Sequence, residues 1–81
     1  FNGKYNASYA AMLLSMDEGI GRVLRQLKQQ GFDDNTLVVF TSDNGGLGMP
    51  EAGPQPTDNA PLRLWKGHVY EGGIRVPMIM R

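Results

Sequence analysis

The first third of the chain repeats apolar residues at steps of three and four positions. The apolar positions are Tyr9, Met12, Leu13, Met16, Ile20, Val23, Leu24 and Leu27. This spacing continues over roughly five helical turns and places the side chains on one face of an amphipathic helix. The charged residues of the other face run from acidic to basic, which is the order that the helix dipole favours. We predict a helix over about residues 5–30 that stops at Gly31.

Two short apolar runs farther along the chain predict strands. The first, over about residues 36–42, is β-branched and aromatic without polar alternation, which is typical of a central strand with parallel neighbours and both faces buried. The second covers about residues 74–80 and contains Pro77, which lacks an N–H group and favours an edge or a strand start. Gly72 and Gly73 precede it and permit either a positive φ or a close approach of two backbones.

Residues 43–73 lack any hydrophobic period and hold most of the 11 glycines and five prolines of the chain. Loops of this length are uncommon in compact domains, and when present they are usually functional or disordered. The order helix, strand, long loop, strand therefore predicts an α/β fold of which this chain is one part. We expect a single partial domain over residues 1–81.

Composition excludes several classes of partner. Eight basic and eight acidic residues give a net charge of zero without a basic stripe, so we expect no nucleic acid partner and no anionic membrane surface. The longest apolar runs, Leu37–Phe40 and Met78–Met80, are far shorter than the roughly 20 residues of a membrane span. The absence of cysteine excludes a disulfide, a thiolate metal site and a cysteine nucleophile within this chain.

Because the first strand would lack neighbours, self-association is expected when the chain is alone.

Asp43 and Asn44 follow the first strand directly, and the carboxyl ends of strands are where open α/β sheets bind ligands. A carboxylate and an amide carbonyl are hard oxygen ligands that suit Ca²⁺ or Mg²⁺ better than Zn²⁺. Calcium takes six to eight oxygens, so at least four further ligands must come from elsewhere. The alternative is a plain loop turn at Asn44-Gly45, and the residues alone leave both interpretations open.

Lys66 is the second candidate, with Arg63 and His68 close by in the sequence. A lysine ammonium can stabilise an oxyanion or a leaving oxygen, which serves sulfuryl or phosphoryl transfer. Taken alone, however, a lysine is more often a solvated surface residue. His68 is more often structural, and Arg63 is expected to lie on the surface or to brace the loop.

Three ordered motifs together resemble the type I sulfatase family, its arylsulfatase-like members in particular. They are Asp43-Asn44-Gly45-Gly46, Leu62-Arg63 through Lys66-Gly67, and Tyr70-Glu71-Gly72-Gly73-Ile74-Arg75-Val76-Pro77. The preceding helix, with Met16 through Leu24, extends the resemblance over nearly the whole chain. Trp65 and His68 depart from the family pattern, where a glycine and a serine or threonine are common.

The resemblance implies an alkaline-phosphatase-like mixed sheet sandwiched by helices, and hydrolysis of sulfate esters in a sulfated small molecule or carbohydrate. It implies a calcium cofactor held in part by Asp43 and Asn44, and a formylglycine nucleophile. By position, Lys66 would contact the sulfate as a catalytic residue, and we assign His68 to substrate binding as well. The family also implies a periplasmic, secreted or lysosomal location rather than a cytoplasmic one.

The chain does not contain the family's nucleophile motif. Formylglycine forms from the first residue of Cys/Ser-x-Pro-x-Arg, and Ser8, Ser15 and Ser42 all lack that proline and arginine. We therefore expect an internal segment of a larger enzyme that is inactive alone. Two alternatives remain: a phosphodiesterase or phosphonate hydrolase of the same superfamily, for which histidine rather than Asn44 would be favoured, and a non-catalytic sulfatase-like interaction module.

Overall fold

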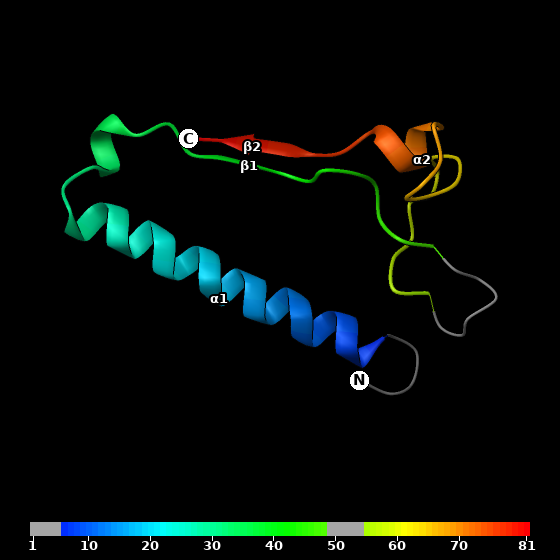
Figure 1. Ribbon diagram of the computed structural model, residues 1–81, viewed down its shortest axis with the longest axis horizontal. Helices are drawn as coiled ribbons and strands as arrows, with labels where there is room; N and C mark the ends of the chain where they lie inside the picture. Colours follow the sequence, from blue (N-terminus) through cyan, green and yellow to red (C-terminus); the bar gives the residue numbers. More distant parts are fainter. Residues whose placement is uncertain (1–5, 49–54) are drawn as a thin grey trace.

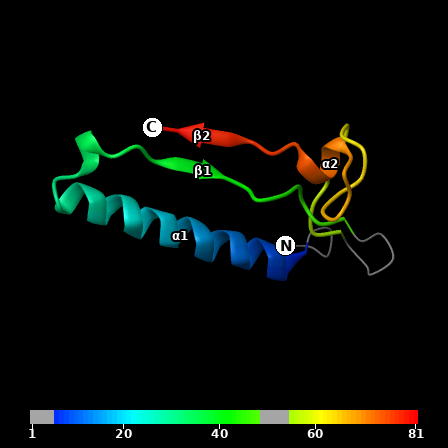
Figure 2. The ribbon, with the colours of Figure 1, turned by 45° about the horizontal axis from the view of Figure 1, so that its top comes forward.

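The computed structural model describes residues 6–48 and 55–81 and forms a small α/β unit (Figure 1). Its elements are α1 (Ala7–Gln29), the 3₁₀ turn η1 (Asp33–Asn35), β1 (Val39–Thr41), α2 (Glu71–Ile74) and β2 (Met78–Met80). The long helix runs alongside a two-stranded ribbon, and the loops with α2 gather at one end (Figures 1 and 2). Both strands are shorter than the sequence predicts, since β1 covers three of the residues 36–42 and β2 covers three of the residues 74–80. The end of the predicted loop and the first predicted residue of the second strand form the short helix α2 instead.

Both ends of α1 have local causes. Asn6 is the N-cap, and its Oδ1 accepts a hydrogen bond of 2.9 Å from the backbone N–H of Tyr9. Gly31 follows the helix at φ 74°, and the Phe32 N–H donates to the Leu27 carbonyl at 3.0 Å, which is a Schellman motif. The predicted stop at Gly31 is thus confirmed, whereas the predicted start near residue 5 lies outside the described residues. Among the described residues, no helix is long and apolar enough to cross a membrane.

The two strands pair antiparallel. Val39 lies opposite Met80, Phe40 opposite Ile79, and Thr41 opposite Met78. The predicted parallel neighbours are wrong for this pair, because a parallel return needs a long crossover along the sheet. Here the described chain between β1 and β2 stays at one end of the ribbon and comes straight back (Figure 1). The second strand begins directly after Pro77 and not at residue 74, because Pro77 has no N–H group to donate to the ladder.

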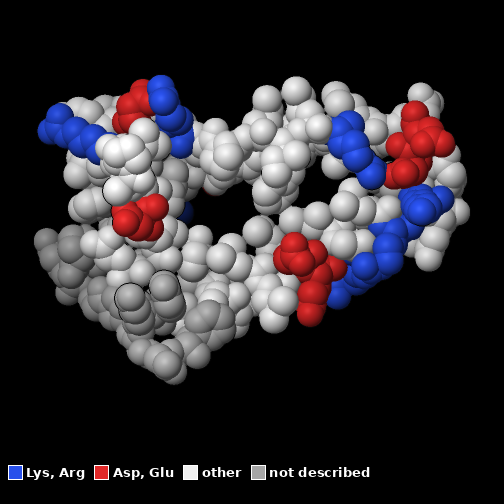
Figure 3. Space-filling view, turned by 180° about the vertical axis from the view of Figure 1, so that it is seen from behind, with Lys and Arg blue, Asp and Glu red and all other residues white. Residues whose placement is uncertain are grey.

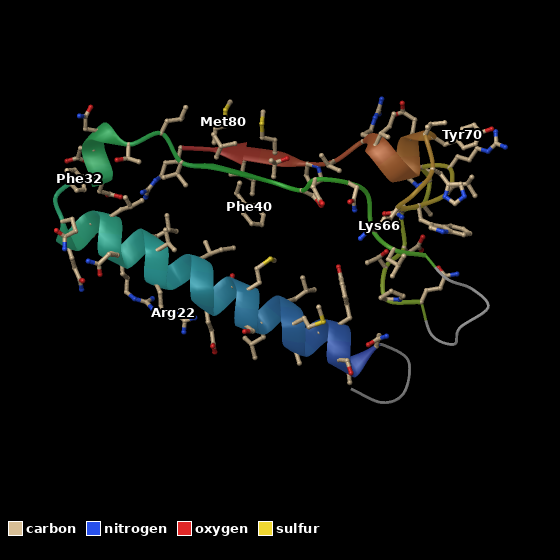
Figure 4. All side chains as sticks on the ribbon, in the orientation of Figure 1. Arg22, Phe32, Phe40, Lys66, Tyr70 and Met80 are labelled. Carbon is tan, nitrogen blue, oxygen red and sulfur yellow. The ribbon has the colours of Figure 1, made fainter. Side chains whose placement is uncertain are left out.

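The cover on both faces that the apolar run of the first strand predicts is not provided by the described part of this chain. Phe40 points from β1 toward α1 (Figure 4), but its side chain is 43% exposed, and that of Ile79 is 65% exposed. An apolar groove of about 390 Å³ separates the helix from the ribbon, and openings between them are visible in Figure 3. The radius of gyration is 15.9 Å, against about 12 Å for a compact domain of this length. Within residues 6–48 and 55–81 no hydrophobic side chain is buried, so these elements do not form a core by themselves.

Candidate functional site

Three buried glycines let the loop after β1 and the loop before β2 pack backbone against backbone. The Gly45 N–H donates to the Gly73 carbonyl at 2.9 Å. A Cβ on Gly45 would lie 1.8 Å from the Gly72 carbonyl oxygen, and one on Gly73 would lie 2.0 Å from that of His68. Neither Gly72 nor Gly73 has a positive φ. The sequence leaves two explanations open for the paired glycines, a positive φ or a close approach of two backbones. The structure shows that close approach is the reason.

This packing brings Lys66 beside Asn44, although the long loop separates them in sequence. The Lys66 N–H donates to the Gly46 carbonyl at 3.0 Å, which ties the two loops together. Lys66 and Asn44 then line one hollow of about 350 Å³, which we call the Asn44–Lys66 pocket. Figure 4 shows Lys66 next to the chain that leaves β1. Among the described residues, no carboxylate forms an ion pair with Lys66, so its charge is not neutralised by them.

Asn44 is half-buried and is held by its own loop. The Ser42 hydroxyl donates to the Asn44 carbonyl at 2.7 Å, and the Asn44 Nδ2 donates to the Gly45 carbonyl at 3.0 Å. The loop therefore uses the nitrogen of the side-chain amide, and the amide oxygen receives no hydrogen bond from the residues that the structure describes.

Asp43 is exposed and lines the adjacent hollow of about 650 Å³ instead. The two hollows share Tyr9, Ser42 and Pro77 as walls, so Asp43 and Asn44 face neighbouring spaces at the end of β1. The structure thus places Asn44 with Lys66, and Asp43 next to them.

The side-chain oxygens of Asp43 and Asn44 are of the chemical type that hard cations bind. The Asp43 carboxylate and the Asn44 amide oxygen are both oxygen ligands of the type that calcium takes. Within residues 6–48 and 55–81, however, no group of three or more His, Cys, Asp or Glu residues could hold a metal ion. Since calcium takes six to eight oxygens, these two residues would provide only part of such a site.

His68 is not one of the residues that line the Asn44–Lys66 pocket. Its Nδ1 is 3.1 Å from the Trp65 carbonyl oxygen, and its ring meets the Trp65 ring edge-on with centroids 5.2 Å apart. These contacts fix the imidazole against its own turn, and contact of His68 with substrate stays a prediction. The Arg63 guanidinium lies 3.9 Å from the centre of the Tyr70 ring, which fits the bracing role expected for Arg63.

Asn59 and Arg75, two polar side chains to which the sequence assigns no role, line the pocket with apolar residues such as Leu47 and Val76. Arg75 forms an ion pair with Glu71 one helical turn earlier. The spacing of four residues between the two opposite charges is the feature of the sequence that could have predicted this ion pair. Asn59 contacts the backbone of Gly46, 13 residues away, and no local pattern indicates such a contact.

Comparison with known proteins gives one consistent answer. The sequence model of the family described as Sulfatase matches residues 2–81. The chain is 46% identical over 83 residues to a protein named Sulfatase from Formosa agariphila, covering 93% of this chain and 14% of that protein. It is 49% identical over 67 residues to Arylsulfatase J from Mus musculus, covering 83% of this chain and 10% of that protein. It is 40% identical over 80 residues to Steryl-sulfatase from Mus musculus, covering 94% of this chain and 13% of that protein.

No solved structure matches the chain. The chain spans only between 10% and 14% of the length of these three relatives. Because the family match extends over nearly every residue, including the Asn44–Lys66 pocket, this chain belongs to the sulfatase family.

Proposed function

We propose that this chain is a segment of an enzyme that hydrolyses sulfate esters of sulfated small molecules or carbohydrates. The observation that carries the proposal is the pocket shared by Asn44 and Lys66, two residues brought together from opposite ends of a long loop. The names of the relatives, Arylsulfatase J and Steryl-sulfatase, support the same reaction class. The whole enzyme is proposed to have an alkaline-phosphatase-like sheet and to work in the periplasm, outside the cell or in the lysosome.

Lys66 is proposed as the sulfate-contacting catalytic residue. Cleavage of a sulfate ester moves negative charge onto the leaving oxygen, and a fixed ammonium group stabilises that charge in the transition state. Its backbone bond to Gly46 fixes where the side chain begins, at the wall of the Asn44–Lys66 pocket. Arg75 adds a second positive group to the pocket wall, although its ion pair with Glu71 offsets part of that charge.

Asp43 and Asn44 are proposed as two of the oxygen ligands of a calcium ion. When bound, calcium would supply a positive charge that orients the sulfate group and stabilises charge on its oxygens. The bond from the Asn44 Nδ2 to the Gly45 carbonyl holds the side-chain amide in one orientation and keeps its oxygen available. The nucleophile, expected to be formylglycine, would come from another part of the protein, because this chain has no Cys/Ser-x-Pro-x-Arg motif.

The test is hydrolysis of an aryl sulfate by a full-length protein that carries this segment. The assay is run with and without a calcium chelator, and beside an Asp43→Ala variant. Loss of activity in both cases supports a sulfatase with a calcium site at Asp43. Hydrolysis of an aryl phosphate or phosphonate but of no sulfate would indicate the phosphodiesterase alternative. No hydrolysis of any ester would indicate a non-catalytic module.

A further inference from the structure

The side chain of Asn59 lies between the two loops that form the Asn44–Lys66 pocket. Its Oδ1 accepts a hydrogen bond of 3.2 Å from the Gly46 N–H, and its Nδ2 donates to the Gly46 carbonyl at 2.9 Å. One half-buried amide thus satisfies both backbone groups of a single residue, as a neighbouring strand would do.

The same amide also reaches the other loop. Its Nδ2 lies 3.4 Å from the Leu64 carbonyl oxygen. The Gly46 carbonyl, in turn, accepts a second hydrogen bond from the Lys66 N–H at 3.0 Å. Asn59 therefore connects the backbone two residues after Asn44 with the backbone two residues before Lys66.

The fit around Gly46 is tight. A Cβ on Gly46 would lie 2.9 Å from the Asn59 Oδ1 and 2.4 Å from the Thr57 Oγ1. The Thr57 hydroxyl also donates to the Leu47 carbonyl at 2.9 Å, so two side chains hold consecutive residues of this loop. Leu64 has a φ of 60°, a conformation that a residue with a side chain adopts rarely, and its carbonyl is one of the groups facing Asn59.

We propose that Asn59 is a positioning residue of this site, which holds Asn44 and Lys66 at the separation that catalysis requires. The inference rests on the proposed sulfatase function. Only a side-chain amide of this length forms hydrogen bonds with both the N–H and the carbonyl of Gly46. A carboxylate accepts from the N–H but donates nothing to the carbonyl. An alanine does neither, and the two loops would then lose two short bonds and one long one.

The experiment compares Asn59→Ala and Asn59→Asp with a matched control in a full-length protein that carries this segment. The control is Thr36→Val, which removes one hydrogen bond of 2.7 Å to the Phe32 carbonyl at the far end of the molecule. Three quantities are measured: kcat and KM on an aryl sulfate, Tm, and hydrogen exchange of the Gly46 and Lys66 amides. Each turnover number is corrected for the folded fraction.

For Asn59→Ala we expect kcat to fall by about 10²-fold, as for a small misplacement of a catalytic group, with KM changed only a few-fold. Exchange of the Gly46 and Lys66 amides should become at least about 10-fold faster, because their partners are released. Thr36→Val should leave kcat and both amides as in the unchanged protein. If Asn59→Ala does not fold, Asn59→Asp takes its place. The aspartate has the same size but does not donate to the Gly46 carbonyl, which is the partner of the Lys66 N–H, so kcat and exchange of the Lys66 amide can still be compared.

Two results would overturn the proposal. A kcat equal to that of the unchanged protein in the folded variants would mean that Asn59 positions nothing. A lower kcat with unchanged amide exchange would mean that Asn59 touches substrate instead. If the unchanged protein hydrolyses no sulfate ester, the proposed function fails, and amide exchange alone then decides whether Asn59 holds the loops.

Discussion

The carbonyl oxygen of Leu64 lies so close to Gly72 that a Cβ built on Gly72 would come within 1.9 Å of it. The Arg63 carbonyl oxygen would be 2.6 Å from the same Cβ, and it already accepts a hydrogen bond of 2.9 Å from the Gly72 N–H. Both obstacles are backbone atoms, which cannot rotate away as a side chain does. The segment that carries Lys66 and the segment that leads into β2 therefore depend on the absence of a side chain at residue 72.

We expect Gly72→Ala to destabilise a full-length protein that carries this segment by about 1–3 kcal/mol or more, as overpacking does, and to lower sulfatase turnover. Thermal denaturation and aryl sulfate hydrolysis provide the measurement. The control is Gly19→Ala in the middle of α1, where the nearest atom to the new Cβ is the end of Arg22 at 3.8 Å. That variant should be neutral or more stable by about 0.5–1 kcal/mol. A Gly72→Ala protein with unchanged Tm would contradict the close packing.

Lys66→Ala should lower turnover of an aryl sulfate by about 10²-fold or more, by analogy with the loss of one transition-state donor. The matched control is Lys28→Ala, because Lys28 is an exposed lysine in the last turn of α1. The fold should persist in both variants, since the contact that ties residue 66 to Gly46 is made by the backbone. Turnover in Lys66→Ala equal to that of the control would remove Lys66 from the catalytic residues.

The helix was accessible from the sequence because its causes are local. Apolar steps of three and four residues predict α1, and Gly31 supplies the positive φ at its end. The antiparallel pairing of β1 with β2 could not be predicted from the sequence, because the relative direction of the two strands depends on the path of the chain between them. Thr41 and Pro77, which are 36 residues apart, meet through a hydrogen bond of 3.0 Å that no local pattern indicates.

The site shows the same division. Motifs single out Asp43, Asn44 and Lys66, and the structure brings the last two to one pocket. The role of Asn59 could not be predicted from a motif, because its hydrogen-bond partners are backbone groups of another loop. The apolar run of the first strand indicates that the strand needs cover on both faces, but no single-chain pattern says which segment provides that cover.

The proposed metal site predicts a specific calcium dependence. A chelator should abolish aryl sulfate hydrolysis, and Asp43→Ala should raise the half-saturating calcium concentration by about 10–100-fold or more, since even partners of metal ligands have effects of that size. The increase of Tm with added calcium gives a second readout that does not depend on turnover. Asp34→Ala, an exposed aspartate of η1, is the control. Equal calcium dependence of the two variants would argue against Asp43 as a ligand.

The 81-residue chain by itself should associate. Its apolar groove is lined from both sides, Leu37 is 72% exposed, and the ribbon of β1 and β2 has two unpaired edges within the described part of the chain. Contiguous exposed apolar surface and free strand edges both favour contact between copies. We expect light scattering to give a mass that rises with concentration, or precipitation of the chain.

A double variant with Phe40→Ser and Ile79→Ser separates this cause from others. The two residues lie opposite each other across the ribbon, and both line the groove facing α1. If the groove drives association, the variant should need a higher concentration to associate than the unchanged chain does. Association that the variant leaves unaltered would instead implicate the strand edges, whose backbone groups the substitutions retain. A monomer at high concentration would contradict both causes, because it would mean that the apolar faces of α1 and the ribbon close on each other in solution.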